Sequence, residues 1–88
     1  MEKLKTLLQN NAQVWLEVKQ KDFKKILNFA KENNYKWVNG KEINPKDDLK
    51  NMKTTALIGF SQNKYIGFIS AMCWHFAKDV KRLKFENL

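Results

Sequence analysis

Residue types that carry out catalysis or bind metals are scarce in this sequence. It has one histidine and one cysteine, in the tripeptide Cys73-Trp74-His75. On a strand these two side chains would share a face, as a Cys–His nucleophile pair or two metal ligands would require. Zinc normally takes three or four protein ligands, and Asp79 is the one further candidate nearby. We therefore expect a half-buried cysteine and a satisfied histidine, with no catalytic or metal site.

Asp47 and Asp48 are the one pair of adjacent carboxylates. Neighbouring side chains point apart on an extended chain, so this pair is not an acid/base dyad. Together with Asn44 it could bind a cation weakly, although the spacing of a calcium loop is missing, and capping of a turn is the simpler interpretation. The glycines are too scattered for a phosphate-binding loop, and no nucleophile elbow is present. The sequence therefore predicts no enzyme and no cofactor.

The charge of the chain points to binding surfaces instead. The net charge is +8, from 17 basic and 9 acidic residues, and Arg82 is the only arginine. Lysine attracts phosphate without reading sequence, whereas arginine is preferred for bidentate readout of guanine or phosphate. A solvated lysine-rich surface and a nucleic-acid-binding surface both remain open. The candidate surface has two sets of residues: Lys19, Lys21, Lys24, Lys25 and Lys31; and Lys78, Lys81, Arg82 and Lys84.

Three aromatic residues near lysines could stack on unpaired bases. They are Tyr35, Trp37 and Tyr65. For Trp37 we prefer packing in the core to contact with a ligand. Tyr65 lies where a hairpin strand begins, so we expect it to be exposed.

These residues must be positioned by elements at the start of the chain that have clear periodicity. Residues 2–9 place leucines three and four apart, as on a short helix, and residues 13–19 alternate as in a half-buried strand. Residues 21–34 have apolar side chains at i, i+3, i+4 and i+7, which predicts the main amphipathic helix. The residues that make these patterns are Leu4, Leu7 and Leu8; Val14, Leu16 and Val18; and Phe23, Ile26, Leu27 and Ala30.

Both ends of the main helix carry signals. Asp22 lies near its start, where a carboxylate can cap free N–H groups. Asn33 or Asn34 can end it, because asparagine tolerates the left-handed conformation that a helix terminus often needs. Asn39-Gly40 is a strong signal of a tight turn, so residues 35–38 are predicted to form a short strand.

The rest of the chain is predicted to be rich in strands. A return strand over residues 41–43 is stopped by Pro45, and residues 46–53 form a polar loop or a helical turn. The runs TTALIGF and KYIGFIS predict a hairpin, in which Gly59 and Gly67 could seat an aromatic ring or allow a bulge. The hairpin strands cover residues 54–60 and 64–70.

The C-terminal segment fits two patterns. Four apolar residues would share one face of a helix, whereas residues 81–85 alternate as a strand. We expect a loop over residues 71–79 and a short last strand. The four residues of the helical pattern are Met72, Phe76, Val80 and Leu83, and the aromatic candidates for the core or its rim are Trp15, Trp37, Phe60, Phe68 and Trp74.

Together these elements predict an α+β fold in a single domain over residues 1–88. One main amphipathic helix would pack on a small, mostly antiparallel sheet of about four to five strands, with a short N-terminal helix. No apolar run approaches the ~18 residues of a membrane span, and the N-terminal residues do not resemble a signal peptide. The lone cysteine excludes an internal disulfide. We therefore expect a cytoplasmic protein with no membrane contact.

Several short stretches resemble those of small proteins encoded by phages and prophages of low-GC Gram-positive bacteria. They are VWLEV, KDFKKILNFAKENNYKWVNGKEI, ALIGF-SQNKYIGFIS and KRLKFENL, within residues 13–88. The shared pattern is a strand, a helix that ends in an "NGYKW-SG"-like motif, a hairpin and a closing strand. Here Asn34 stands where those proteins often have glycine, and Asn39 where serine is common, and both keep the turn chemistry. The resemblance implies the cytoplasm of an infected bacterium, where such proteins often block host machinery.

The expected function is therefore non-enzymatic binding to a host protein or protein–nucleic-acid complex, such as a defence nuclease of the CRISPR type. The basic charge argues against mimicry of nucleic acid, so the partner surface would have to be acidic or already bound to nucleic acid. The alternative is a lysine-rich nucleic-acid-binding protein without strong sequence specificity. A small structural subunit that self-associates through an exposed sheet edge is a third hypothesis.

Overall fold

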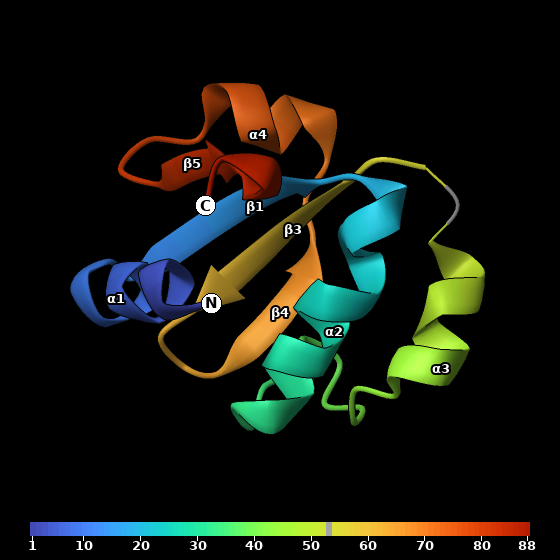
Figure 1. The fold of residues 1–88 in the computed structure, drawn as a ribbon. Coiled ribbons are helices and arrows are strands. Elements are labelled where there is room, and N and C mark those ends of the chain that lie inside the picture. The colour runs from blue at the N-terminus through green and yellow to red at the C-terminus, as the bar shows by residue number, and fades with distance from the viewer. Residues whose placement is uncertain (53) are drawn as a thin grey trace.

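The computed structural model describes residues 1–52 and 54–88, which form one sheet with helices packed against it (Figure 1). Lys53, part of the segment predicted as a loop or helical turn, lies outside the described residues. The helices are α1 (Glu2–Asn10), α2 (Phe23–Glu32), α3 (Pro45–Asp48) and α4 (Ala71–Phe76). The strands are β1 (Gln13–Val18), β2 (Lys36–Trp37), β3 (Ala56–Ser61), β4 (Tyr65–Phe68) and β5 (Lys81–Lys84), and short 3₁₀ turns are η1 (Gln20–Asp22), η2 (Leu49–Asn51) and η3 (Phe85–Asn87). The predicted α+β fold class is confirmed.

The five strands lie in the order β2-β4-β3-β1-β5. The predicted hairpin is confirmed, with β3 antiparallel to both β4 and β1. Both edge strands are parallel to their neighbours, so the sheet is mixed where a mostly antiparallel one was expected. Parallel strands need a crossover connection, and α4 supplies it between β4 and β5.

One face of the sheet carries the main core. The alternation predicted for β1 is confirmed, because Val14, Leu16 and Val18 are all fully buried. The helices α1 and α2 lie over this face (Figure 1), and the buried Leu4 of α1 belongs to the same core. The other large side chains of this core are Phe23, Ile26, Leu27, Ile58, Phe60 and Ile66.

The sequence predicted the C-terminal end of α2 correctly but not its N-terminal end. Asn34 adopts φ 65°, so an asparagine does end the helix in the left-handed conformation. The prediction that Asp22 caps the helix is wrong. The turn η1 leads directly into α2, the N–H group of Asp22 donates to the Lys19 carbonyl at 2.9 Å, and the Asp22 side chain accepts no cap hydrogen bond. Asp22 is buried instead, 7% exposed, with a carboxylate oxygen 3.8 Å from Lys25 Nζ.

The strands after α2 are shorter than predicted, and a helix follows them. Gly40, at φ 86°, closes the expected turn with an N–H donated to the Trp37 carbonyl at 2.8 Å. The return strand is reduced to one bridge between Lys36 and Glu42. Pro45 then opens α3, because the fixed φ of proline suits the first position of a helix. No helix in the described parts of the chain is long and apolar enough to cross a membrane.

The second face of the sheet is covered by α4, where a loop was predicted. That prediction is wrong for residues 71–76, although β5 confirms the short last strand. The hydroxyl of Ser70 caps α4 by accepting from the Cys73 N–H at 3.1 Å. Trp74 stacks on Trp15, with ring centroids 6.4 Å apart, and this contact with a distant strand stabilises a helix too short to persist alone.

Gly59 makes room for that packing. A Cβ at this position would lie 2.8 Å from Ile69 Cδ1 and 3.0 Å from Trp15 Cδ1. The expectation that Gly59 seats an aromatic ring is therefore confirmed. At Gly67, which pairs with Gly59 across the hairpin, the neighbour is the exposed side chain of Val38.

Candidate interaction site

The residues considered for catalysis do not converge. Cys73 and His75 lie two residues apart on α4, where successive side chains are rotated by about 100°, so they point roughly 160° apart. Both are exposed to solvent, so the expectation of a half-buried cysteine is wrong. Within residues 1–52 and 54–88, no group of three or more histidine, cysteine or acidic side chains could hold a metal ion.

The acidic pair at 47 and 48 has a structural role that the sequence did not reveal. Asp48 Oδ2 accepts the indole N–H of Trp37 at 2.9 Å and the backbone N–H of Asn44 at 2.8 Å. Asn44 in turn caps α3 by accepting the N–H of Asp47 at 3.4 Å. Capping of a turn, the simpler of the two interpretations, is therefore what this pair does. Asp48 additionally positions the ring of Trp37.

The three candidate aromatic residues lie in different environments. Tyr35 is buried, 4% exposed, with its ring edge-to-face against Phe60 at 5.1 Å, so it cannot stack on a base. Burial also raises the pKa of its phenol. Trp37 is half-buried and stacks on Phe68 at 5.3 Å, and Phe68 is itself 57% exposed. Tyr65 is 42% exposed, as expected.

The first lysine set is only partly free to meet a ligand. Lys19 Nζ lies 2.8 Å from a Glu86 carboxylate oxygen, and Lys25 lies near Asp22. The remaining members are exposed and make no ion pair within the described residues. These members are Lys21, Lys24 and Lys31.

In the second set, the arginine does not belong to the surface. Arg82 Nε donates to the Trp74 carbonyl at 2.5 Å, and its two terminal nitrogens donate to the carbonyls of Ala77 and Val80. These bonds satisfy carbonyl groups at and beyond the end of α4. The exposed members of this set are therefore Lys78, Lys81 and Lys84.

Glu86 is where the two lysine sets meet, although the sequence separates them widely. The hydrogen bond from Lys19 lowers the pKa of the Glu86 carboxyl, and the charges of Lys84 and Lys21 add to this effect. The same hydrogen bond raises the pKa of Lys19. Sequence reasoning could not find this cluster because it depends on η3 folding back beside the end of β1.

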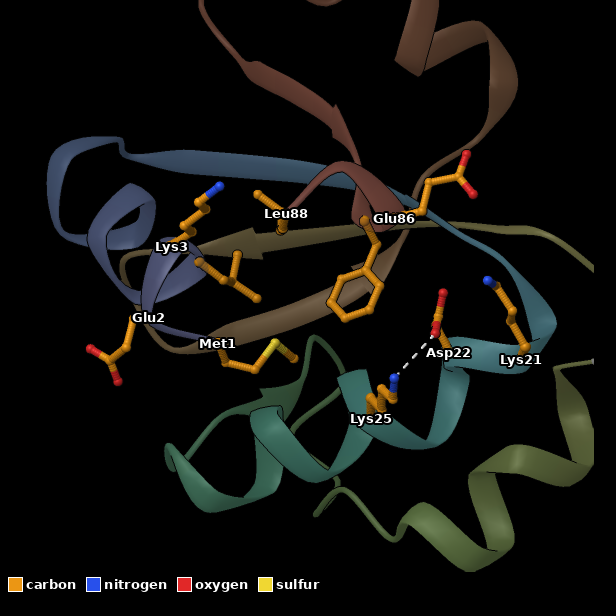
Figure 2. Close-up of a pocket in the computed structure, with 10 residues that line it drawn as sticks. Met1, Glu2, Lys3, Lys21, Asp22, Lys25, Glu86 and Leu88 are labelled. Atoms are coloured by element: carbon orange, nitrogen blue, oxygen red, sulfur yellow. Dashed lines mark ion pairs between the residues drawn. The ribbon is translucent and has the colours of Figure 1, made fainter.

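A hollow of about 570 Å³ lies next to this cluster, between the first turn of α1, the start of α2 and the C-terminal residues (Figure 2). The lysines at its rim are offset by carboxylates on the same wall. Figure 2 shows Lys25 paired with Asp22, and the Glu86 carboxylate turned away from the hollow. An anion would therefore meet no concentrated positive charge here. The charged side chains of the lining are Glu2, Lys3, Lys21, Asp22, Lys25 and Glu86.

The outward face of α4 carries the most exposed large apolar side chains of the described residues apart from Val38. Trp74 faces the sheet, and the helical repeat of about 100° per residue places Met72 and Phe76 on the opposite side, roughly 40° from each other. They are 72% and 78% exposed. Arg82 and Trp74 hold the helix on the sheet, so this apolar pair is presented from a fixed position. The sequence pattern placed Met72 and Phe76 on one helical face. Because a loop was predicted for this segment, the pair was not recognised as a candidate binding surface.

Comparison of the chain with protein-family models, with curated proteins and with solved structures produced no match. The site therefore has to be interpreted from its own chemistry.

Proposed function

We propose that this protein is a non-enzymatic accessory protein of a phage or mobile element, which binds and blocks a host macromolecular complex such as a defence nuclease. The observation that carries the proposal is the exposed pair Met72 and Phe76, on a helix whose other face is held to the sheet. Exposed methionine and aromatic side chains are typical anchors at protein interfaces. The net charge of +8 favours an acidic partner surface.

The positions of the other candidates also favour protein contact over chemistry on a substrate. Cys73 and His75 diverge, and the two adjacent aspartates hold Trp37 and α3. Direct binding of nucleic acid is less favoured, because Tyr35 is buried and Arg82 is bound to backbone carbonyls.

The test is affinity capture from a lysate of a low-GC Gram-positive bacterium, with half of the lysate treated with nuclease. The wild-type chain should capture a stoichiometric protein that survives the nuclease. The double variant Met72→Ser/Phe76→Ser should lose it, because the apolar anchors are gone. Val38→Ser is the matched control, since Val38 is 72% exposed but lies elsewhere, over Gly67. Capture that is equal for all three proteins would contradict the proposal.

Direct binding of nucleic acid is a second candidate, because Lys19, Lys21 and Lys84 gather around one carboxylate. Here binding of a labelled single-stranded oligonucleotide should weaken steeply with salt. Lys21→Glu/Lys84→Glu should reduce the slope of the logarithm of the binding constant against the logarithm of the salt concentration. The reduction should correspond to the loss of about one to two phosphate contacts. Lys46→Glu, a charge reversal on α3, should change it much less. A salt dependence that is the same in all three proteins would exclude the Glu86 cluster as the contact.

A further inference from the structure

We propose that the free edge of β5 binds an extended acidic peptide segment of the partner, which adds to the sheet as a further strand. The inference rests on the proposed function, since it names the chemistry of a contact with the same kind of partner. It starts from the sheet order, in which β5 is the last strand and, among the residues that the structure describes, pairs with β1 alone. A strand edge of this kind offers N–H and C=O groups to another chain.

An apolar groove of about 500 Å³ runs along this edge, between α1 and β5. Leu83 shares a sheet face with the buried Leu16, its partner in the β1–β5 register, and it forms one wall of the groove. Leu7 of α1 forms the facing wall, and both leucines are half-buried. A strand added to β5 would therefore have every second side chain over apolar surface.

The charges around the groove favour a negatively charged occupant. Lys3 and Lys81 lie at its rim, and Lys84 projects on the other face of β5. The one acidic residue of the lining, Glu2, lies 3.8 Å from Lys5. Alternate side chains of an added strand would then meet apolar surface and lysine, so the occupant should alternate apolar and acidic residues.

The same charges disfavour a second copy of this chain as the occupant. The edge strand reads Lys81-Arg82-Leu83-Lys84, with three cations in four residues. Pairing of two such strands would place like charges opposite each other, which is destabilising. Edge lysines generally protect a sheet from self-association, and here they leave an acidic strand as the compatible partner.

The probe for the test is a blocked hexapeptide of alternating valine and glutamate, titrated into the isotope-labelled full chain and followed by NMR. Amide signals of residues 81–84 and of α1 should shift, with a Kd of about 1 mM or tighter. A peptide of the same composition with three valines followed by three glutamates should bind at least about tenfold more weakly. Thr6→Glu, an exposed charge at the rim, should weaken binding a few-fold. Gln9→Glu, on the same helix but outside the groove, should not.

Backbone methylation of the probe separates strand addition from loose electrostatic contact. All N–H groups of alternate residues point to the same edge of a strand, so methylating either the valine or the glutamate set blocks one edge only. One methylated peptide should lose at least about tenfold in affinity and the other should bind as before. The proposal is overturned if neither or both lose binding, if residues 81–84 do not respond up to millimolar peptide, or if the block peptide binds equally well.

The two proposals fail independently. If Met72→Ser/Phe76→Ser captures the same partner as the wild type while the hexapeptide binds β5, the role of α4 is wrong and the β5 edge stands. If the hexapeptide does not bind but the double variant loses its partner, the reverse holds.

Discussion

Arg82 Nε lies 2.5 Å from the carbonyl oxygen of Trp74, and this hydrogen bond joins the last strand to the helix before it. The ring of Trp74 in turn stacks on Trp15 of β1, which is the register partner of Arg82. Through these contacts β1, α4 and β5 are each linked to the other two. The only arginine in a lysine-rich chain therefore has a structural role, which uses the several donors of one guanidinium.

Replacement of that guanidinium should destabilise the protein even when the charge is kept. We expect Arg82→Lys to lower the free energy of unfolding by about 2 kcal/mol, because an ammonium group cannot reach carbonyls of Trp74, Ala77 and Val80 together. Urea denaturation measures this change. Lys84→Arg on the same strand should leave the stability within about 0.5 kcal/mol. Equal midpoints for Arg82→Lys and the wild type would show that the hydrogen bonds do not contribute.

The two glycines of the hairpin should respond differently to alanine. Gly59→Ala places a methyl group 2.8 Å from Ile69 and against the buried Trp15 ring, so the packing must shift, and we expect a loss of about 1–3 kcal/mol. Gly67→Ala meets Val38, which is exposed and can move, so the change should be smaller than about 1 kcal/mol. Thermal unfolding and tryptophan fluorescence report both effects. The opposite order of stability would show that Trp15 does not need the space above Gly59.

Tyr35 should make the protein less stable at alkaline pH. Burial raises the pKa of its phenol above the usual 10.0, so the folded state holds the proton more tightly than the unfolded state. Stability is then unaffected below about pH 10 and falls as the pH rises from there toward the folded pKa. Tyr35→Phe should reduce this fall in pH-dependent unfolding, whereas Tyr65→Phe, at an exposed site, should not. Parallel pH profiles for both variants would contradict the prediction.

The Lys19–Glu86 pair should be visible in titrations. Glu86 has a pKa below its usual 4.5, so its part of the ion pair is present above that pH and is lost as the pH falls through the folded pKa. The raised pKa of Lys19 means that its part is present below about 10.5 and is lost as the pH rises through the folded value. NMR titration of the Glu86 carboxyl should show Lys19→Ala moving the midpoint up. Lys36→Ala, which breaks the pair with Glu42, should leave it unchanged.

Local periodicity was sufficient to predict most elements of this fold. The main helix follows from the spacing of Phe23, Ile26, Leu27 and Ala30, and β1 from alternation, because burying one face of an element imposes its own repeat on the sequence. The turns at Asn34 and Gly40 could be predicted because left-handed backbone favours few residue types. The class of the fold followed from the order of these elements.

The tertiary structure decided the features that depend on contacts between residues far apart in the sequence. α4 depends on Trp15, which lies almost at the other end of the chain, and on the bonds from Arg82, so the pattern of residues 71–79 alone was ambiguous. The burial of Asp22 and the contact of Asp48 with Trp37 likewise depend on neighbours that no local pattern reveals. The candidate surfaces are of the same kind. Met72, Phe76 and the β5 edge are available because the rest of the fold leaves them uncovered, and exposure is a property of the whole packed chain.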